Sequence, residues 1–135
     1  MAPRAVYVSI DEARGTRGDA VVVDVLRAFS TAAWAFELGA ERIVLTDNVD
    51  DALALKASIP DALALKDSQP LPGFELTNSP ILLQEHDLKG LTIVQLTRHG
   101  TVGAVAARAA EHLFCASFLT ASATAAVLRA LCPSE

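Results

Sequence analysis

Runs of apolar residues alternate along the chain with segments that have the composition of helices. The apolar runs predict strands over residues 21–26, 42–46, 62–66, 91–97 and 114–119. The intervening segments predict helices over residues 32–38, 48–57, 102–113 and 122–131. Ser30 and Thr31 offer an N-cap to the first helix, Gly39 stands where a C-terminal glycine is expected, and Asp47 or Asn48 can cap the second helix.

The order of these elements predicts an α/β fold. Alternating strands and helices favour a mostly parallel sheet with helices on both faces. Run 21–26 is continuously apolar apart from one charge, so we expect both of its faces to be covered. Residues 67–80 hold three prolines and no hydrophobic period, which predicts a loop. The last predicted helix leads into no further strand, which indicates an incomplete domain: a truncated product, a fragment, or a domain completed by a partner.

Composition narrows the class of protein. The chain has 135 residues, of which 52% are hydrophobic and 20% charged, so we expect one domain, residues 1–135, with a real core. The net charge is −5 and the 11 Lys and Arg residues are scattered, which disfavours a nucleic-acid partner. Arg108, Glu111 and His112 interrupt the longest apolar stretch, so no membrane partner is expected. With no signal peptide and with Cys115 and Cys132 in apolar surroundings, the sequence predicts a cytoplasmic protein.

Candidate chemistry follows the ends of the predicted strands, where open α/β sheets bind ligands. Carboxylates, basic groups and hydroxyls gather there: Asp24, Arg27, Ser30, Thr31, Thr46, Asp47, Lys66, Asp67, Thr97, Arg98, His99, Gly100, Thr101, Ser117 and Thr120. Helix N-termini bind anions, and a neighbouring carboxylate can hold Mg²⁺, so the set suits phosphoryl chemistry. Glycine-rich nucleotide-binding motifs, the nucleophile elbow of hydrolases and a second aspartate two residues after Asp24 are all absent.

Three short sequence blocks make the predicted chemistry more specific. They are D-V-L-R-A-F-S-T at residues 24–31, G-F-E-L-T-N-S-P at 73–80 and T-R-H-G-T at 97–101. In this order they resemble the 2-phosphosulfolactate phosphatase family. The resemblance implies a three-layer α/β/α fold, a requirement for Mg²⁺, and hydrolysis of 2-phospho-3-sulfolactate to sulfolactate and phosphate. In some organisms that step belongs to coenzyme M biosynthesis.

The resemblance also implies roles for individual residues. Asp24, Arg27 and Glu75 are the expected catalytic residues, with Asp24 and Glu75 as metal ligands and Arg27 neutralising charge on the substrate. A metal-activated water is the simplest nucleophile, and a covalent carboxylate intermediate stays open. The expected substrate is a small phosphorylated acid, and the residues expected to bind it are Ser30, Thr31, Asn78, Ser79, Thr97, Gly100 and Thr101.

The chain departs from the family pattern at several positions. Glu75 stands where the family has Asp, and Thr77 replaces a glycine, which would strain a backbone with positive φ. Arg98 and His99 replace Thr and Asn, and residues 65–68 lack the family's G-E-R block. Family members are also longer.

Structural interpretations of the same residues stay open. Asp24 can cap a turn or pair with Arg27, the hydroxyl residues can be caps, and Glu75 can be solvated. The alternative function is therefore a non-catalytic or vestigial anion-binding domain of the same family. A third alternative is a fragment that is stable only as a homo-oligomer.

Overall fold

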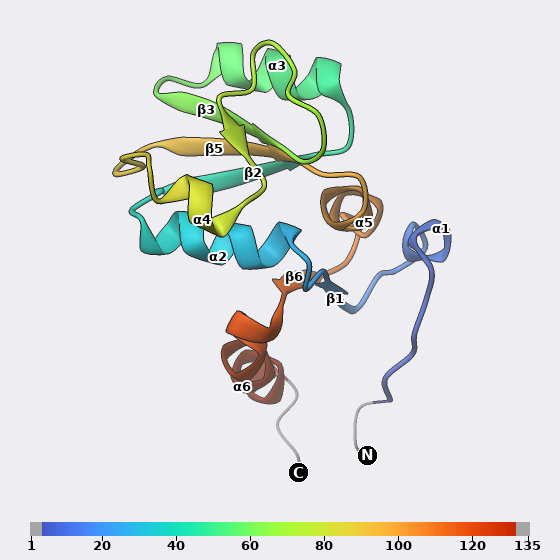
Figure 1. The fold of residues 1–135 in the computed structure, drawn as a ribbon. Helices are drawn as coiled ribbons and strands as arrows, with labels where there is room; N and C mark the ends of the chain where they lie inside the picture. Colours follow the sequence, from blue (N-terminus) through green and yellow to red (C-terminus); the bar gives the residue numbers. More distant parts are fainter. Residues whose placement is uncertain (1–3, 132–135) are drawn as a thin grey trace.

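The computed structural model describes residues 4–131, and its centre is a four-stranded parallel sheet in the order β2-β5-β3-β4. Helix α3 lies on one face of this sheet, and helices α2 and α4 lie on the other (Figure 1). This arrangement confirms the expected three-layer α/β/α fold. The bounds are β2 Arg42–Thr46, β3 Ala62–Lys66, β4 Leu76–Thr77, β5 Thr92–Leu96, α2 Ala28–Glu37, α3 Val49–Ser58 and α4 Pro80–Leu83.

A second, two-stranded parallel sheet lies beside the first. Its strands are β1 (Asp19–Val23) and β6 (His112–Ala116), with Val21 opposite Phe114 and Val23 opposite Ala116. Helix α5 (Gly100–Ala106) contacts both β2 and β1 and so connects the two sheets. The remaining elements are α1 (Ile10–Ala13), the 3₁₀ turn η1 (Phe118–Thr120) and α6 (Ala121–Leu131).

The main core fills both sides of the four-stranded sheet. Every residue of β5 is buried, as expected for a central parallel strand covered on both faces. On one side Ile93 packs with Leu65 and with Leu83 of α4. On the other side Val94 and Leu96 pack with residues of α3. The sheet is therefore held by apolar contact on both faces.

Strand β1 of the second sheet is covered on one face only. Val22 and Ala20 contact apolar residues of α5 and its neighbours, whereas Val21 and Val23 are 40% and 65% exposed. The prediction that run 21–26 is covered on both faces was therefore wrong for β1. Whether the second face of a strand is covered depends on segments far away in the sequence. A run of valines therefore does not reveal whether that face is buried.

Several predicted bounds were right. β2 and β3 have the predicted bounds, α3 follows Asn48 as its N-cap, and Gly39 follows α2 with φ +97°. Because a positive φ is costly for a residue with a Cβ, the glycine allows the chain to turn away from the helix there.

Other bounds differ from the prediction. β1 begins and ends earlier than expected, and α2 begins at Ala28 with Arg27 as N-cap in place of Ser30–Thr31. The helix predicted over 102–113 ends at Ala106, because residues 112–116 pair with β1 as β6. The predicted loop 67–80 contains β4 and leads into α4, and Thr77 lies in that strand without positive φ.

Two further sequence predictions concern composition. Cys115 is a half-buried free thiol of β6, and Cys132 lies outside the described residues. Within residues 4–131, no helix is both long and apolar enough to cross a bilayer.

Candidate functional site

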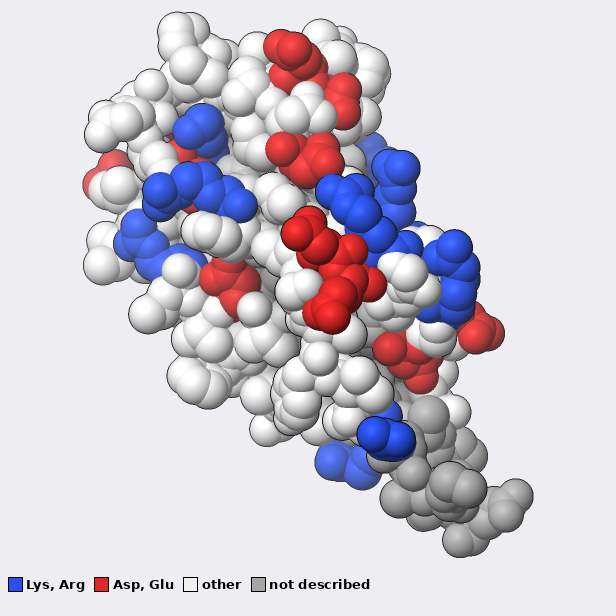
Figure 2. Space-filling view, turned by 90° about the vertical axis from the view of Figure 1, so that its right-hand side faces the viewer, with Lys and Arg blue, Asp and Glu red and all other residues white. Residues whose placement is uncertain are grey.

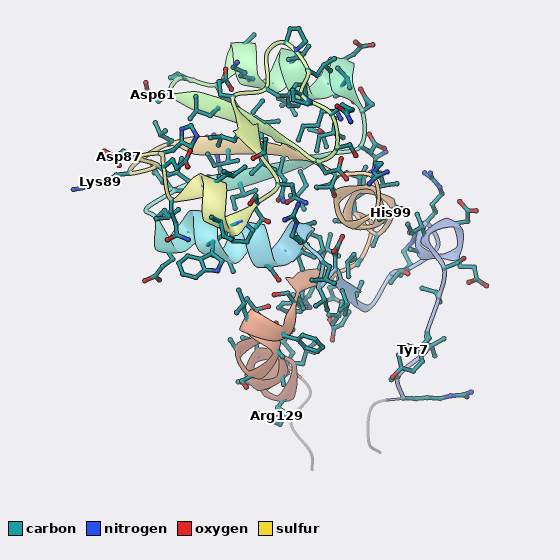
Figure 3. The ribbon with its side chains drawn as sticks, in the orientation of Figure 1. Tyr7, Asp61, Asp87, Lys89, His99 and Arg129 are labelled. Atoms are coloured by element: carbon teal, nitrogen blue, oxygen red, sulfur yellow. The ribbon has the colours of Figure 1, made fainter. Side chains whose placement is uncertain are left out.

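The candidate site lies where β5 ends and α5 begins. Figure 3 places His99 at this end of the sheet and Asp61, Asp87 and Lys89 at the opposite end. Figure 2, which looks onto this side of the molecule, shows Lys and Arg side chains beside Asp and Glu side chains. This surface therefore carries both positive and negative charges. An anion would be bound there by particular side chains or backbone N–H groups and not by a uniformly positive surface.

Asp24 occupies the junction between the two sheets. It directly follows β1, and its backbone N–H continues the ladder by donating to the carbonyl of Ala116. Its Oδ1 accepts a hydrogen bond from the N–H of Ala28 at 3.3 Å, so the carboxylate caps the start of α2. The capping role left open by the sequence is therefore real, and it holds the carboxylate at a helix N-terminus.

Gly100 brings the start of α5 against the same carboxylate. A Cβ built on Gly100 would lie 2.6 Å from Asp24 Oδ2 and 2.6 Å from the Cβ of Ala28. Both separations are far below van der Waals contact, so only glycine fits at this position. The structure thus brings together two predicted site residues, Asp24 and Gly100, from segments 76 positions apart in the sequence.

A buried glutamine that the sequence analysis did not single out supports this junction. Gln95 is the last residue but one of β5 and is fully buried. Its Nε2 donates to the carbonyl of Ala28 at 2.8 Å and ties the first residue of α2 to the sheet. An amide side chain inside a mostly apolar strand was the signal that could have identified it, because a buried amide needs a partner.

Thr97 and Thr101 fasten the loop between β5 and α5. The Thr97 N–H donates to Thr101 Oγ1 at 2.8 Å, and the Thr101 N–H donates to Thr97 Oγ1 at 3.1 Å. The Thr101 hydroxyl in turn donates to the Thr97 carbonyl at 3.0 Å. Both side chains are buried, so their hydroxyl groups shape the loop instead of facing solvent.

Arg98 is held beside this loop by Asp67. The Asp67 carboxylate follows β3 and accepts from the Arg98 N–H at 3.0 Å and from Arg98 Nε at 3.3 Å through the same oxygen, Oδ2. Arg98 remains mostly exposed, and Arg27, at the N-cap of α2, is exposed as well. Two guanidinium groups on the surface therefore flank the junction from different loops.

Asn78 and Ser79 lie near the end of β3. The Asn78 N–H donates to the Lys66 carbonyl at 3.1 Å, and the Asn78 side chain is buried. Ser79 caps α4, because its Oγ accepts from the Leu82 N–H at 3.4 Å. Asp67, the residue after Lys66, accepts hydrogen bonds from Arg98. Arg98 lies two residues before Gly100, which packs against Asp24. The carboxyl ends of β3 and β5 therefore connect this region with Asp24.

Glu75 is engaged elsewhere in the fold. One of its carboxylate oxygens pairs with Lys56 Nζ of α3, and the other accepts from the Ala64 N–H in the middle of β3 at 2.9 Å. Burial by itself would raise the pKa of Glu75, but the Lys56 and Ala64 hydrogen bonds and the Lys56 charge lower it overall. In this arrangement Glu75 joins α3 to β3.

The hydroxyl residues of α2 also have structural surroundings. Ser30 Oγ donates to the Val25 carbonyl at 2.9 Å and closes the turn that contains Arg27. Thr31 lies on the buried side of α2, and its hydroxyl has no partner within the described part of the chain. The predicted N-cap role of this pair was wrong, since α2 begins before either residue.

The carboxylate chemistry of the site therefore centres on Asp24. Residues 4–131 contain no cluster of three or more His, Cys, Asp or Glu side chains placed to hold a metal. Asp24 Oδ2 faces the start of α5 without a hydrogen bond from the described residues, so one oxygen is available to a cation. Mg²⁺ is often held by one or two carboxylates together with waters and substrate phosphate, which Asp24 fits. Glu75 is directed away from Asp24 in this arrangement, because one of its oxygens pairs with Lys56 and the other accepts from the Ala64 N–H.

A separate groove of about 760 Å³ lies between α3 and α5. Its walls include Asp51 and Leu55 of α3 and Val105 and Arg108 from α5 and the turn after it. Asp24 does not line this groove. The groove and the Asp24 junction are therefore different features of the surface.

Comparison with known proteins gives a consistent result. A family model described as 2-phosphosulpholactate phosphatase matches residues 7–134. The chain is 32% identical over 135 residues to the probable 2-phosphosulfolactate phosphatase of Bacillus subtilis, covering 98% of this chain and 59% of that protein. Proteins with the same name from Thermus thermophilus and Thermotoga maritima are 38% and 36% identical. Those matches cover 85% and 82% of this chain but 49% and 48% of the relatives, so the chain spans about half their length.

Proposed function

The chain belongs to the 2-phosphosulfolactate phosphatase family, and we propose that it acts as a Mg²⁺-dependent phosphomonoester hydrolase on 2-phospho-3-sulfolactate. The products of this reaction are 3-sulfolactate and phosphate. The observation that carries the proposal is the Asp24 carboxylate, fixed between the starts of α2 and α5 by Ala28 and Gly100. A carboxylate held at the start of a helix brings together a cation ligand and backbone donors for an anion.

Each residue near Asp24 has a distinct proposed role. Arg27, exposed at the N-cap of α2, neutralises charge on phosphoryl or sulfonate oxygens. Gly100 allows the Asp24 carboxylate to lie directly against the start of α5, because a Cβ there would be 2.6 Å from Asp24 Oδ2. Thr97 and Thr101 act by holding the loop rigid, because their hydroxyl groups bond within it. Preorganised groups of this kind stabilise developing charge without reorganising during the reaction.

Asp24 is the proposed holder of Mg²⁺, and Arg98 is a second candidate for the substrate's acid group. When bound, Mg²⁺ supplies Lewis acidity toward the phosphoryl oxygens. Arg98 is already oriented by Asp67 and keeps its guanidinium exposed, so it can contact the sulfonate or carboxylate of the substrate. The phosphate and the acid groups of this small substrate would then contact different loops.

The direct test is phosphate release from 2-phospho-3-sulfolactate with Mg²⁺ or with chelator. Asp24→Asn should abolish turnover and leave the fold intact, because the asparagine oxygen still accepts from the Ala28 N–H. Asp87→Asn is the matched control: Asp87 lies at the opposite end of the sheet and caps a turn through the Lys89 N–H (Figure 3). Near-normal turnover by Asp24→Asn would contradict the assignment.

A second candidate function is a non-catalytic anion-binding domain. It is favoured by Glu75, whose two oxygens are occupied by Lys56 and Ala64, so that the chain presents one carboxylate at the junction where the family pattern suggested two. The discriminating measurement is thermal unfolding with phosphate. A rise in melting temperature without turnover of the phosphorylated substrate would support this second function, because a ligand stabilises the state that binds it.

A further inference from the structure

The groove between α3 and α5 is lined mainly by apolar side chains. They come from β2, α3, α5 and β6 and are Leu45, Ala54, Leu55, Ala104, Val105 and Leu113. Strand β2 contacts both helices, so its residues lie between the two walls. Along α3 the lining positions 51, 54, 55 and 58 are three or four residues apart, which places them on one side of the helix. A volume of about 760 Å³ is typical of a site for a small organic molecule.

Two carboxylates line the same groove where β2 leads into α3. Asn48, the N-cap of α3, donates through its Nδ2 to Asp47 Oδ1 at 3.0 Å and to Asp51 Oδ2 at 2.7 Å. One amide group therefore holds both carboxylates as close neighbours. The second oxygen of each carboxylate accepts no hydrogen bond from residues 4–131. Neighbouring negative charges repel each other, so a cation bound between them is stabilised.

A buried hydroxyl group lies beside this pair of carboxylates. Thr46, the last residue of β2, lines the groove and is 4% exposed. Its hydroxyl has no hydrogen-bond partner in the part of the chain that the structure describes. A buried hydroxyl without a partner is costly, and a ligand N–H at this end of the groove would satisfy it. Three oxygen acceptors thus gather here, and a primary ammonium group has three N–H donors.

Arg108 adds one positive charge to the groove. It lies in the turn after α5, is exposed, and forms no ion pair with any residue that the structure describes. The two carboxylates outnumber it, which favours a cation over an anion. A second positive charge on the ligand would be repelled by the guanidinium. The charges therefore fit a ligand with a single ammonium group.

We propose that this groove binds a small primary amine with an apolar hydrocarbon part. The ammonium group bonds to the free oxygens of Asp47 and Asp51 and to the Thr46 hydroxyl. The hydrocarbon part lies against apolar walls that include Leu55 and Val105. Because Asp24 does not line the groove, this site is separate from the proposed phosphatase site.

The test is an NMR titration of the whole ¹⁵N-labelled chain with two probes that share a phenyl ring but differ in charge. The amine probe is 2-phenylethylamine, and the acid probe is 3-phenylpropionate. We expect 2-phenylethylamine to shift the amide signals of Asp51, Leu55 and Val105 and to saturate with a dissociation constant on the order of 1 mM, as is usual for so small a ligand. The acid probe should not saturate these signals.

Matched variants locate the ammonium group. Asp51→Asn removes a charge but keeps an acceptor for the Asn48 amide, and should weaken binding of 2-phenylethylamine by about tenfold. Asp50→Asn is the control, because Asp50 is the adjacent acidic residue of α3 and does not line the groove. It should leave the affinity unchanged.

Thr46→Val removes the hydroxyl and preserves the shape of the side chain. It should weaken binding of 2-phenylethylamine by about threefold and raise the melting temperature of the free protein, since an unpartnered buried hydroxyl is lost. A purely structural role of Thr46 would not produce these opposite effects.

Three results would overturn the proposal. The first is the absence of saturation by 2-phenylethylamine. The second is equally tight binding of 3-phenylpropionate, because the carboxylates would then not select the ligand. The third is an equal loss of affinity in Asp50→Asn and Asp51→Asn, which would mean that the acidic surface attracts amines without a defined site. All of these readouts measure binding, so they stand apart from the outcome of the phosphatase assay.

Discussion

The four-stranded sheet and the β1–β6 sheet differ in how much of each is covered. β5 is buried along its whole length between α3 and the α2–α4 layer, whereas β1 alternates between half-buried and exposed residues. Both sheets are parallel and rich in β-branched and apolar residues. The difference shows that an apolar strand can be buried on both faces, but that burial also requires other segments to pack on it.

The same substitution in the two sheets should measure this difference most directly. Val94→Ala in β5 removes fully buried methyl groups and should lower the free energy of unfolding by about 2 to 3 kcal/mol. Val23→Ala in β1 removes mostly exposed methyl groups and should change it by less than about 0.5 kcal/mol. Urea unfolding of both variants is the measurement. Equal losses would mean that the face of β1 that carries Val21 and Val23 is covered in solution.

The junction between the sheets should be intolerant of any added atom. Gly100→Ala places a methyl group 2.6 Å from Ala28 Cβ and from Asp24 Oδ2, and should destabilise the protein by about 1 to 3 kcal/mol. It should also move the Asp24 carboxylate and reduce the proposed phosphatase activity. Gly18→Ala is the control: nothing lies within 4 Å of the added Cβ, just before β1. Thermal unfolding that ranks Gly18→Ala as the worse variant would contradict this view of the junction.

Next to the four-stranded sheet, Glu75 should contribute a pH-dependent part of stability. Its pKa is lowered in the folded protein, so its contribution is present above the unfolded pKa of about 4.5 and is lost as pH falls through the folded pKa. The side chain is partly exposed, so the contribution should be no more than about 1 kcal/mol. Glu75→Gln and Lys56→Gln should each flatten the loss of stability between neutral and acidic pH. An unchanged profile in either variant would exclude the pair as its source.

The reactivity of the Cys115 thiol should show whether the face of the β1–β6 sheet that contains Val22 stays covered by its neighbours. Burial raises the pKa of its thiol to about 11, so at pH 8 the folded protein should hold almost no thiolate. In a Cys132→Ser background, a disulfide reagent should modify Cys115 much more slowly in the folded protein than in urea. Rapid modification without denaturant would show that β6 detaches readily from its neighbours.

Much of the fold could be predicted from sequence because it depends on local signals. The apolar runs at 42–46 and 62–66 gave strand bounds without error, and Asn48 and Gly39 marked the ends of helices. The alanine-rich stretch 102–113 defeated the same approach. Alanine has a high helix propensity, and a run of alanines shows no clear hydrophobic periodicity that would mark where a helix ends. The pairing of residues 112–116 with β1 could therefore not be detected from the sequence.

The candidate site was predictable in part. Asp24 and Gly100 were singled out from separate motifs, and the structure brings them into contact. The surroundings of Glu75 were not predictable, because its partner Lys56 is 19 positions away on a helix face that any charged residue could occupy. The buried hydroxyl groups of Thr31, Thr97 and Thr101 were also unpredictable. A hydroxyl side chain near a strand end has the same sequence signature whether it faces solvent or the interior.

The hydrogen bond from Gln95 to the Ala28 carbonyl has a consequence for the order of folding. It joins positions 67 residues apart, so forming it closes a long loop and has a high entropic cost. Contacts of such span form slowly, after the local turns and helices. The turn that presents Arg27 and receives the Asp24 cap is closed by local hydrogen bonds, but it is attached to the sheet only once β5 is in place. A nascent chain emerging from the ribosome would carry both residues long before it could use them.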